Sequence, residues 1–171
     1  MSEAVKCKDR VKQYLGTNIL DCGVDDDKIV PWAIGVDLYR NDTKGIVNLV
    51  GDATRLYWFQ DNVFDTVFSS HTLEDIIDTE SVLREWLRVL KPAGYLILYV
   101  PHKNYYPNIG HPLANGGHRH DFIPSDIINI MQQINQTKLI SSNSYGPPNG
   151  IYDYDNRHKI EYSFEQVFQK L

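Results

Sequence analysis

Three aspartates stand near the ends of short apolar runs, where a carboxylate can bind a hydroxyl or an amino group. Asp21 lies in TNILDC, Asp37 in AIGVDL, and Asp52 directly after GIVNLV. In open parallel sheets, ligands bind beyond the carboxyl ends of the strands, and an acid there can accept the hydroxyls of a ribose. An acid after the third run could meet an adenine amino group. Each aspartate alone also fits a turn or capping role, but three at successive run ends favour a nucleoside site.

Histidines form the second group of candidates. His71 and His102 each follow a predicted strand, and the loop 101–121 contains three more, His111, His118 and His120. A histidine with a pKa near neutrality is the natural general base for an acceptor hydroxyl. A structural hydrogen bond is the alternative for His71. The loop histidines and Asp121 could instead bind a divalent metal, although ligand spacing in a Gly-rich loop is a weak signal.

Aromatic side chains allow two interpretations each. One group follows Asp52 and could pack on an adenine ring or in the core: Tyr57, Trp58 and Phe59. The other group lies in two long loops and would suit a sugar or aromatic acceptor, or a plain surface: Tyr105, Tyr106, Tyr152 and Tyr154.

The elements that must position these residues follow from hydrophobic periodicity. Apolar runs bounded by Asp, Asn or Gly predict buried strands at 17–22, 33–38, 45–50, 64–70 and 94–101. Helices are predicted at 3–15, at 79–90 and from Pro124 onward. The segment Lys91-Pro92-Ala93-Gly94 is predicted to turn the chain between helix and strand. Two closing strands are predicted at 138–146 and 159–171.

Strands and helices that alternate predict an α/β fold, with a mostly parallel sheet covered by helices on both faces, in one domain over residues 1–171. The net charge of −5 argues against a nucleic-acid-binding surface. Only two cysteines, Cys7 and Cys22, indicate a reducing compartment. No apolar run reaches the roughly 20 residues of a membrane span, so a cytoplasmic protein is expected.

Longer motifs resemble those of the class I S-adenosylmethionine-dependent methyltransferases, in particular a small type-11-like group with a shortened first loop. Leu20-Asp21-Cys22-Gly23 stands where the family has its Gly-rich first motif, and Asp37 stands where its ribose-binding acid lies. GDATRLYWFQDNVFDTVFSSHTLEDI is similar to the run from the adenine-contacting acid through the fourth strand. EWLRVLKPAGYLILYVP resembles the helix, Lys-Pro-x-Gly turn and fifth strand. The match covers residues 17–101 motif by motif.

This resemblance implies a Rossmann-like, seven-stranded sheet whose last strand is antiparallel, and S-adenosylmethionine as the cofactor. The residues that it places at the cofactor are Asp21, Cys22, Gly23, Asp37, Leu38, Asp52, Ala53 and Ser69. The residues that it places near the transferred methyl group are His71, His102, His118 and His120. It implies no metal site.

One departure from the family lies in the first loop, where the second Gly of Asp-x-Gly-x-Gly is Asp25, followed by Asp26 and Asp27. Glycine serves there because the backbone approaches the ligand, often at positive φ. Aspartate tolerates left-handed backbone better than most residues, and its charge attracts a cofactor that bears a sulfonium and an ammonium. We therefore expect the cofactor to bind, weakened at most by the added side chain.

The expected function is methyl transfer from S-adenosylmethionine to a small-molecule or glycan acceptor, by O-methylation. The alternative from another class is a catalytically weak or silent binding or scaffold protein with the same fold, which the Asp25-Asp26-Asp27 run supports. A nicotinamide-dependent oxidoreductase would need Gly-x-Gly-x-x-Gly after the first strand, and the sequence does not supply it.

Overall fold

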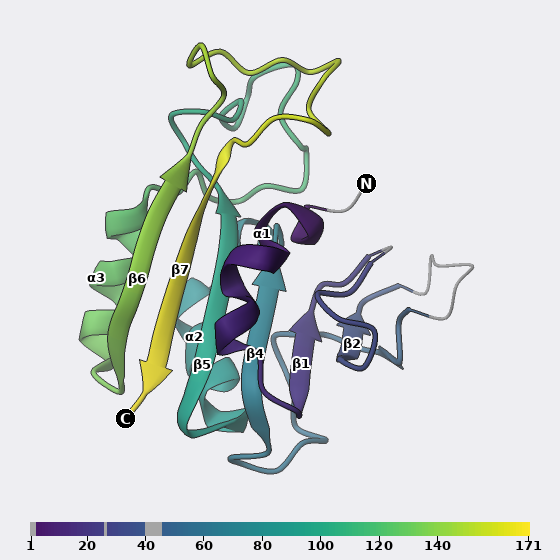
Figure 1. Cartoon of the computed structure of the whole chain (residues 1–171), viewed down its shortest axis with the longest axis vertical. Coiled ribbons are helices and arrows are strands. Elements are labelled where there is room, and N and C mark those ends of the chain that lie inside the picture. The colour runs from purple at the N-terminus through teal and green to yellow at the C-terminus, as the bar shows by residue number, and fades with distance from the viewer. Residues whose placement is uncertain (1–2, 26, 40–45) are drawn as a thin grey trace.

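The computed structural model describes residues 3–25, 27–39 and 46–171. Its centre is a seven-stranded sheet with the strand order β3-β2-β1-β4-β5-β7-β6 (Figure 1). The strands are β1 Ile19–Cys22, β2 Ile34–Asp37, β3 Leu49–Val50, β4 Phe64–Ser70, β5 Leu90–Pro101, β6 Thr137–Tyr145 and β7 Ser163–Lys170. Strands β1 to β5 pair in parallel, whereas β7 runs antiparallel to both β5 and β6. The predicted sheet and its antiparallel last strand are confirmed.

Helices cover both faces of this sheet, as predicted. Helix α1 (Ala4–Val11) lies on one face, while α2 (Thr79–Val89) and α3 (Pro124–Ile134) lie on the other (Figure 1). On the α1 side, Cys7 packs in one core cluster with residues of the central strands. On the opposite side, Trp86 packs in the second cluster with Ile127 of α3. In the described part of the chain, no helix is long and apolar enough to cross a membrane.

The start, the buried face and the end of helix α2 can each be explained from its sequence. Asp78 caps its start, because the Asp78 carboxylate accepts a hydrogen bond from the Ser81 amide at 3.0 Å. Apolar residues at helical spacing are fully buried on one face: Val82, Leu83, Trp86 and Leu87. The helix ends where Leu90 turns to extended backbone and starts β5.

The clearest differences between the predicted and the observed boundaries lie at three places. Residues 91–94 form no separate turn but an irregular stretch inside β5, where the pairing moves from Phe64–Leu90 to Thr66–Tyr95. Ala93 takes a φ of +61° there, so the extra residues are accommodated by one left-handed position. The strand expected at 45–50 comprises Leu49–Val50, and Gly45 lies outside the described residues. The strand expected from 159 begins at Ser163, after a turn.

The order of the strands fixes where a ligand can bind. From β1 the chain moves outward to β2 and β3, and then returns to place β4 on the other side of β1. The loops after β1 and β4 therefore leave the sheet in opposite directions and open a crevice at the carboxyl ends of these strands. The connections on this side are short, because residues 23–25 and 27–33, the described part between β1 and β2, contain no helix.

Candidate functional site

A two-part cleft opens at the carboxyl ends of β1, β2 and β4. Its outer part, the strand-tip cleft, has a volume of about 410 Å³, and its walls include Gly23, Asp37, Leu38, Asp52, Ala53 and Thr72. Its inner part, the inner pocket, has a volume of about 320 Å³, and its walls include Glu3, Asp21, Asp25, Asp27, His71 and His158. Gly23, Asp25 and His71 line both parts, so the two parts adjoin.

Asp37 ends β2 at the rim of the strand-tip cleft. Its Oδ2 atom accepts a hydrogen bond from the Asp25 amide at 3.0 Å, and its Oδ1 atom accepts one from the Tyr39 amide at 3.2 Å. Each carboxylate oxygen has two lone pairs, so both can still accept a hydrogen bond from a ligand. Asp37 therefore shapes the loop beside it and keeps capacity for ligand hydroxyls.

Asp52 follows β3 on the same rim. Its Oδ1 atom accepts hydrogen bonds from the Thr54 amide at 2.8 Å and the Thr54 hydroxyl at 2.7 Å. Within the described residues, the Oδ2 atom has no partner. The neighbouring Ala53 also lines the cleft, so an acceptor oxygen and a small apolar surface lie side by side.

Asp21 is a buried carboxyl at the end of β1 that contributes to the inner pocket. Its Oδ2 atom accepts a hydrogen bond from the Ile29 amide at 2.7 Å. Burial raises the pKa of the Asp21 carboxyl to about 7, although this hydrogen bond and Lys28 act in the opposite direction. The group is thus poised to change its charge near neutral pH.

Three other predicted cofactor contacts differ in how they face the cleft. Leu38 is 57% exposed and lines the strand-tip cleft. Cys22 is fully buried in the core, and the Ser69 hydroxyl donates to the Cys22 carbonyl at 3.1 Å. Neither Cys22 nor Ser69 is among the lining residues of either part of the cleft. Their side chains support the floor of the site instead of facing a ligand.

The first loop adopts the backbone that its resemblance to the Gly-rich motif predicts. Gly23 has a φ of +76°, and Asp25, which stands in place of the second Gly, has a φ of +44°. A Cβ atom on Gly23 would lie 2.0 Å from the Thr72 Oγ1 atom. The loop therefore packs its backbone directly against Thr72. Asp26 lies outside the described residues.

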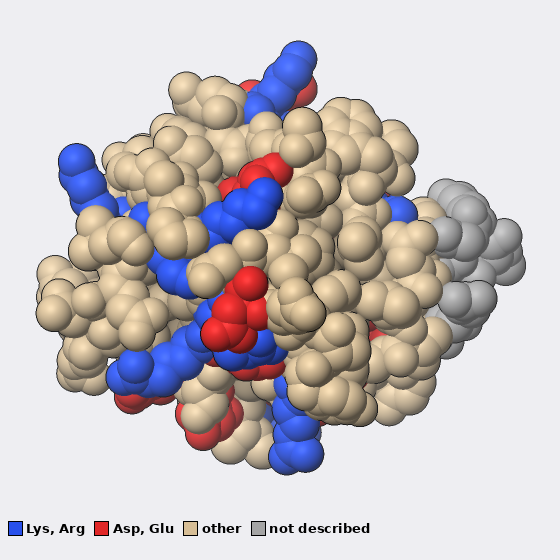
Figure 2. Space-filling view, turned by 90° about the horizontal axis from the view of Figure 1, so that it is seen from below, with Lys and Arg blue, Asp and Glu red and all other residues tan. Residues whose placement is uncertain are grey.

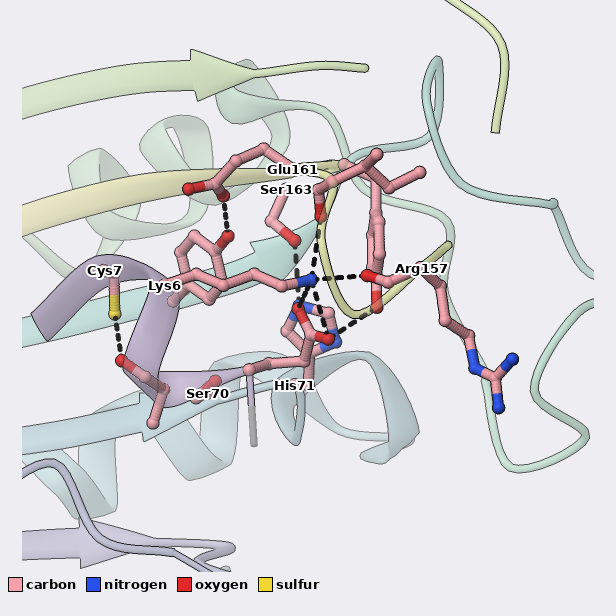
Figure 3. A network of polar contacts seen from close by, with 12 residues as sticks. Lys6, Cys7, Ser70, His71, Arg157, Glu161 and Ser163 are labelled. Atoms are coloured by element: carbon pink, nitrogen blue, oxygen red, sulfur yellow. Dashed lines mark hydrogen bonds and ion pairs between the residues drawn. The ribbon is translucent and has the colours of Figure 1, made fainter. Parts of the chain in front are cut away.

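His71 follows β4, lines both parts of the cleft, and has a strained backbone with a φ of +50°. Its Nε2 atom lies 2.8 Å from the Ser163 hydroxyl and 3.8 Å from Glu3 Oε2 (Figure 3). Burial and the nearby Lys6 lower the pKa of His71 to about 3, so the ring is neutral at physiological pH. Backbone strain at a cleft residue is the kind of outlier that marks functional sites.

The other three predicted histidines lie away from the cleft walls. His102, His118 and His120 line a separate small depression with Tyr106 and Asp121. The loop that carries them folds onto Glu74, whose carbonyl accepts hydrogen bonds from the Arg119 and His120 amides at 2.7 and 3.1 Å. Burial lowers the pKa of both His102 and His118. None of these three histidines is among the lining residues of the two-part cleft.

The metal alternative for the loop histidines finds no geometric support. Within the described residues, which include His111, His118, His120 and Asp121, no group of three or more His, Cys, Asp or Glu side chains could hold a metal ion. His118 instead lies 3.7 Å from the buried Glu74 carboxyl. Burial raises the pKa of that carboxyl well above its usual range.

Glu3 and Ala4 of the N-terminal segment line the inner pocket, and no sequence signal pointed to them. Glu3 Oε1 accepts hydrogen bonds from the Lys6 ammonium at 2.9 Å and from the Tyr162 hydroxyl at 2.8 Å. The Lys6 ammonium also donates to the carbonyls of Arg157 and Ile160 at 2.9 and 2.8 Å. The start of α1 is thereby fastened to the segment before β7 (Figure 3). Only tertiary packing brings these residues, about 150 positions apart, together.

The aromatic candidates separate into core and surface roles. Tyr57 is 81% exposed, Trp58 packs over Gly51, and Phe59 packs on Phe64. None of these three is among the lining residues of the cleft, where Tyr39 lies instead. In the two long loops, Tyr106 packs against Tyr152 and Tyr162 with ring centroids 5.2 Å apart in each pair.

Comparisons with known proteins agree with this geometry. Residues 31–98 match the family model described as a methyltransferase domain. Demethylmenaquinone methyltransferase from Mycolicibacterium paratuberculosis is 36% identical over 80 residues, which cover 44% of this chain and 34% of that protein. The protein of the same name from Mycobacterium marinum is 36% identical over 72 residues, which cover 39% and 31%. The chain spans about a third of the length of the curated relatives it matches.

Solved structures extend the likeness to nearly the whole chain. A SAM dependent methyltransferase from Archaeoglobus fulgidus superposes with a TM-score of 0.67 at 15% identity, covering 99% of this chain and 95% of that chain. An S-adenosylmethionine dependent methyltransferase from Mesorhizobium loti superposes with a TM-score of 0.69 at 15% identity, covering 95% and 96%. Over nearly its whole length the chain thus has the fold of these solved methyltransferase structures, and residues 31–98 match the methyltransferase domain model.

Proposed function

We propose that this chain binds S-adenosylmethionine in the two-part cleft and transfers its methyl group to a hydroxyl of a small-molecule acceptor. The observation that carries the proposal is the strand-tip cleft itself. Asp37 and Asp52 stand at neighbouring strand ends around a space of about 410 Å³, at the switch point where ligands bind in open α/β sheets.

The residues present fit the adenosyl part of the cofactor. Asp37 would accept the ribose hydroxyls, since both of its oxygens retain lone pairs. Asp52 Oδ2 would accept from the adenine amino group, and Leu38 and Ala53 would contact the base. The positive φ of Gly23 lets the first loop approach the ligand closely. When bound, S-adenosylmethionine supplies an already activated methyl group on a cationic sulfur.

The charge of the inner pocket fits the cationic part of the cofactor. Four carboxyl groups line it, those of Glu3, Asp21, Asp25 and Asp27, and no Lys or Arg is among its described lining residues. Opposite charges at such short range, in a partly desolvated site, attract strongly. Asp25 and Asp27 thereby add to cofactor affinity.

For the acceptor, we infer a small molecule with a reactive hydroxyl, such as a phenol, a quinol or a sugar. The curated relatives carry the name of a demethylmenaquinone methyltransferase, which favours a small aromatic acceptor over a macromolecule. The chain would position the acceptor and take its proton. His71 is the candidate base, because it lines both parts of the cleft. Burial lowers its pKa to about 3, below the near-neutral value expected of a general base, so the bound substrates would have to raise that pKa for His71 to take the proton.

We further propose that the protein works in the cytoplasm without binding nucleic acid. Both cysteines are free and buried, which suits a reducing compartment. On the face seen in Figure 2, Lys and Arg side chains lie beside Asp and Glu. The described residues include the Arg88–Asp61 and Lys91–Asp65 ion pairs. A phosphate backbone is instead met by a surface with a basic excess.

Calorimetric titration with S-adenosylhomocysteine tests the cofactor site. Wild-type protein should bind, and Asp37→Ala should bind roughly 100-fold more weakly or worse, because two charge-assisted hydrogen bonds are lost. Glu80→Ala is the matched control, since Glu80 is an exposed carboxylate on α2 that pairs with Arg84. Wild-type protein that gives no binding heat, or an Asp37→Ala variant that binds equally well, would overturn the proposal.

Product formation then separates the enzyme from a silent binding protein with the same fold. Wild-type protein incubated with S-adenosylmethionine and a panel of phenols, quinols and sugars should release S-adenosylhomocysteine with one acceptor class. The left-handed backbone of Asp25 favours the enzyme, because the loop keeps the conformation that a Gly would give it. Binding without turnover across the whole panel would favour the silent protein.

A further inference from the structure

The inner pocket has to accept a negative charge as well as positive ones. The amino acid end of S-adenosylmethionine carries a carboxylate beside its ammonium, and both enter this pocket if the cofactor binds as proposed. Carboxyl groups already line the pocket, and no Lys or Arg is among its described lining residues. Because like charges at short range repel, the ligand carboxylate needs a hydrogen-bond donor from the protein.

The lysines on either side of the pocket are already bound to other groups. The Lys6 ammonium lies 2.7 Å from Glu3 Oε2 and also donates to two carbonyls of the segment before β7. The Lys28 ammonium donates to the Ala33 carbonyl at 2.9 Å and to Asn48 Oδ1 at 2.8 Å. Neither lysine is among the described lining residues, so neither is placed to receive the ligand carboxylate.

Three backbone amides of the first loop also have acceptors. The Gly23 amide donates to the Val36 carbonyl at 2.8 Å. The Asp25 amide donates to Asp37 Oδ2 at 3.0 Å, and the Asp27 amide donates to a carbonyl of the same loop at 3.1 Å. The side chains of the pocket are therefore its other source of donors.

Three described residues of the pocket carry a side-chain donor, namely Ser70, His71 and His158. The Nε2 atom of His71 already meets the Ser163 hydroxyl at 2.8 Å. The Ser70 Oγ atom is buried and has no hydrogen-bond partner within the described residues. A buried hydroxyl without a partner is costly, and a ligand oxygen would give Ser70 one.

The His158 ring is exposed and has no polar partner in the part of the chain that the structure describes. Each of the other five histidine rings has one, in His71, His102, His111, His118 and His120. An imidazole donates from one nitrogen when neutral and from both when protonated. His158 can therefore donate a hydrogen bond to a carboxylate in either state.

The backbone around His158 is tied to helix α1. The Lys6 ammonium donates to the carbonyls of Arg157 and Ile160, at 2.9 and 2.8 Å, which stand on either side of His158 in the chain. Figure 3 shows Lys6 reaching across to this segment. His158 is thereby held at the wall of the pocket before any ligand binds.

We propose that His158, together with the Ser70 hydroxyl, binds the carboxylate at the amino acid end of the cofactor. The inference rests on the proposed function, because it assigns a partner to one group of that ligand. The acids of the pocket would take the ammonium and the sulfonium, and His158 the carboxylate. The pocket would thus distinguish an amino acid from a plain amine.

Calorimetric titration with two ligands tests this assignment. Decarboxylated S-adenosylmethionine keeps the sulfonium and the ammonium of S-adenosylmethionine and lacks only the carboxylate. His158→Ala should weaken binding of S-adenosylmethionine by roughly 10-fold or more, and should change binding of the decarboxylated compound by less than about 2-fold. Ser70→Ala should show the same pattern. Because His158 is exposed and has no polar partner, its substitution should not disturb folding.

Charge reversal at the same position gives a second measurement. His158→Glu adds a carboxylate to the wall, so it should weaken S-adenosylmethionine further and bind the decarboxylated compound more tightly than wild type does. His111→Ala is the matched control, because it removes another exposed imidazole that is not among the lining residues of the cleft. It should bind both compounds as wild type does.

Two results would overturn the inference: unchanged binding of S-adenosylmethionine in His158→Ala, or an equal loss for both compounds. Failure of the proposed function looks different, because wild-type protein would then bind neither compound. If wild-type protein binds both and His158→Ala makes no distinction between them, the cofactor site stands and the role of His158 falls.

Discussion

The carboxylate of Asp37 holds the backbone amide of Asp25 at 3.0 Å, which ties the tip of β2 to the loop after β1. The same carboxylate is the one that we propose binds the ribose. The site is therefore preorganised, because the acid that would hold the ligand already fixes the loop beside it. The bond uses the backbone of Asp25, so it does not depend on the residue type at that position.

Substitutions at Asp25 should separate backbone strain from side-chain effects. Asp25→Gly and Asp25→Ala both remove the carboxylate, but only Ala keeps a Cβ at a φ of +44°. A left-handed backbone costs a non-Gly residue roughly 1–2 kcal/mol. We expect Asp25→Ala to be less stable than Asp25→Gly by about 1 kcal/mol in urea unfolding. Equal midpoints would show that this backbone relaxes once the side chain is gone.

The order of strands and helices could be predicted because local signals for it are strong. The run FDTVFSS is bounded by polar residues and became the buried strand β4, and the stripe along 79–90 became α2. The stretch 91–94 was misjudged for a physical reason. Lys-Pro-Ala-Gly is typical of a turn, yet here it forms a bulge that β4 tolerates within the ladder.

The sequence could indicate which residues meet at the strand ends, but not where the long loops fold. Asp37 and Asp52 reach the cleft because parallel strands bring their carboxyl ends to one edge. His118 and His120 do not, because the loop that carries them is held by the Glu74 carbonyl, and spacing in sequence says nothing about where a long loop folds. Glu3 was missed for a related reason, since α1 places it in the inner pocket by tertiary packing alone.

Gly23→Ala should lower the stability of the protein and weaken ligand binding in the cleft. The new Cβ would lie 2.0 Å from Thr72 Oγ1, at a φ of +76°, so strain and overlap act together. We expect a loss of roughly 2–4 kcal/mol in the free energy of unfolding, measured by urea denaturation, and weaker binding of S-adenosylhomocysteine. Gly116→Ala is the control, because a Cβ there meets nothing within 4 Å. Similar losses in both variants would contradict this account.

Asp21→Asn should stabilise the unliganded protein at alkaline pH. Folding raises the pKa of this carboxyl from 3.8 to about 7, so the folded state resists its ionisation. Stability is lost as the pH rises from about 4 through 7 and is fully present below the unfolded pKa. Asparagine keeps an oxygen for the Ile29 amide and removes the buried charge. We expect a gain on the order of 1–3 kcal/mol at pH 8 that disappears near pH 4.

Asp65→Asn should change the free energy of unfolding in the opposite direction to Asp21→Asn in the same experiment. The Lys91 ammonium and the Asn18 amide hold the pKa of Asp65 below its usual range. A lowered pKa contributes stability above the unfolded value of about 4 and loses it as the pH falls further. Asp65→Asn should therefore destabilise the protein at pH 8. If both substitutions changed the free energy of unfolding at pH 8 in the same direction, the electrostatic explanation would be ruled out.

Binding of S-adenosylmethionine should release a proton near neutral pH. Asp21 lines the inner pocket with a pKa of about 7, so it is about half protonated there at pH 7. A cation in the pocket favours the ionised carboxylate and lowers that pKa. Titrations at pH 7 in phosphate and in Tris, whose ionisation enthalpies differ, should give heats that differ in proportion to the protons released. In Asp21→Asn the two buffers should give the same heat. If wild-type protein already gives equal heats in both buffers, Asp21 does not face the cation.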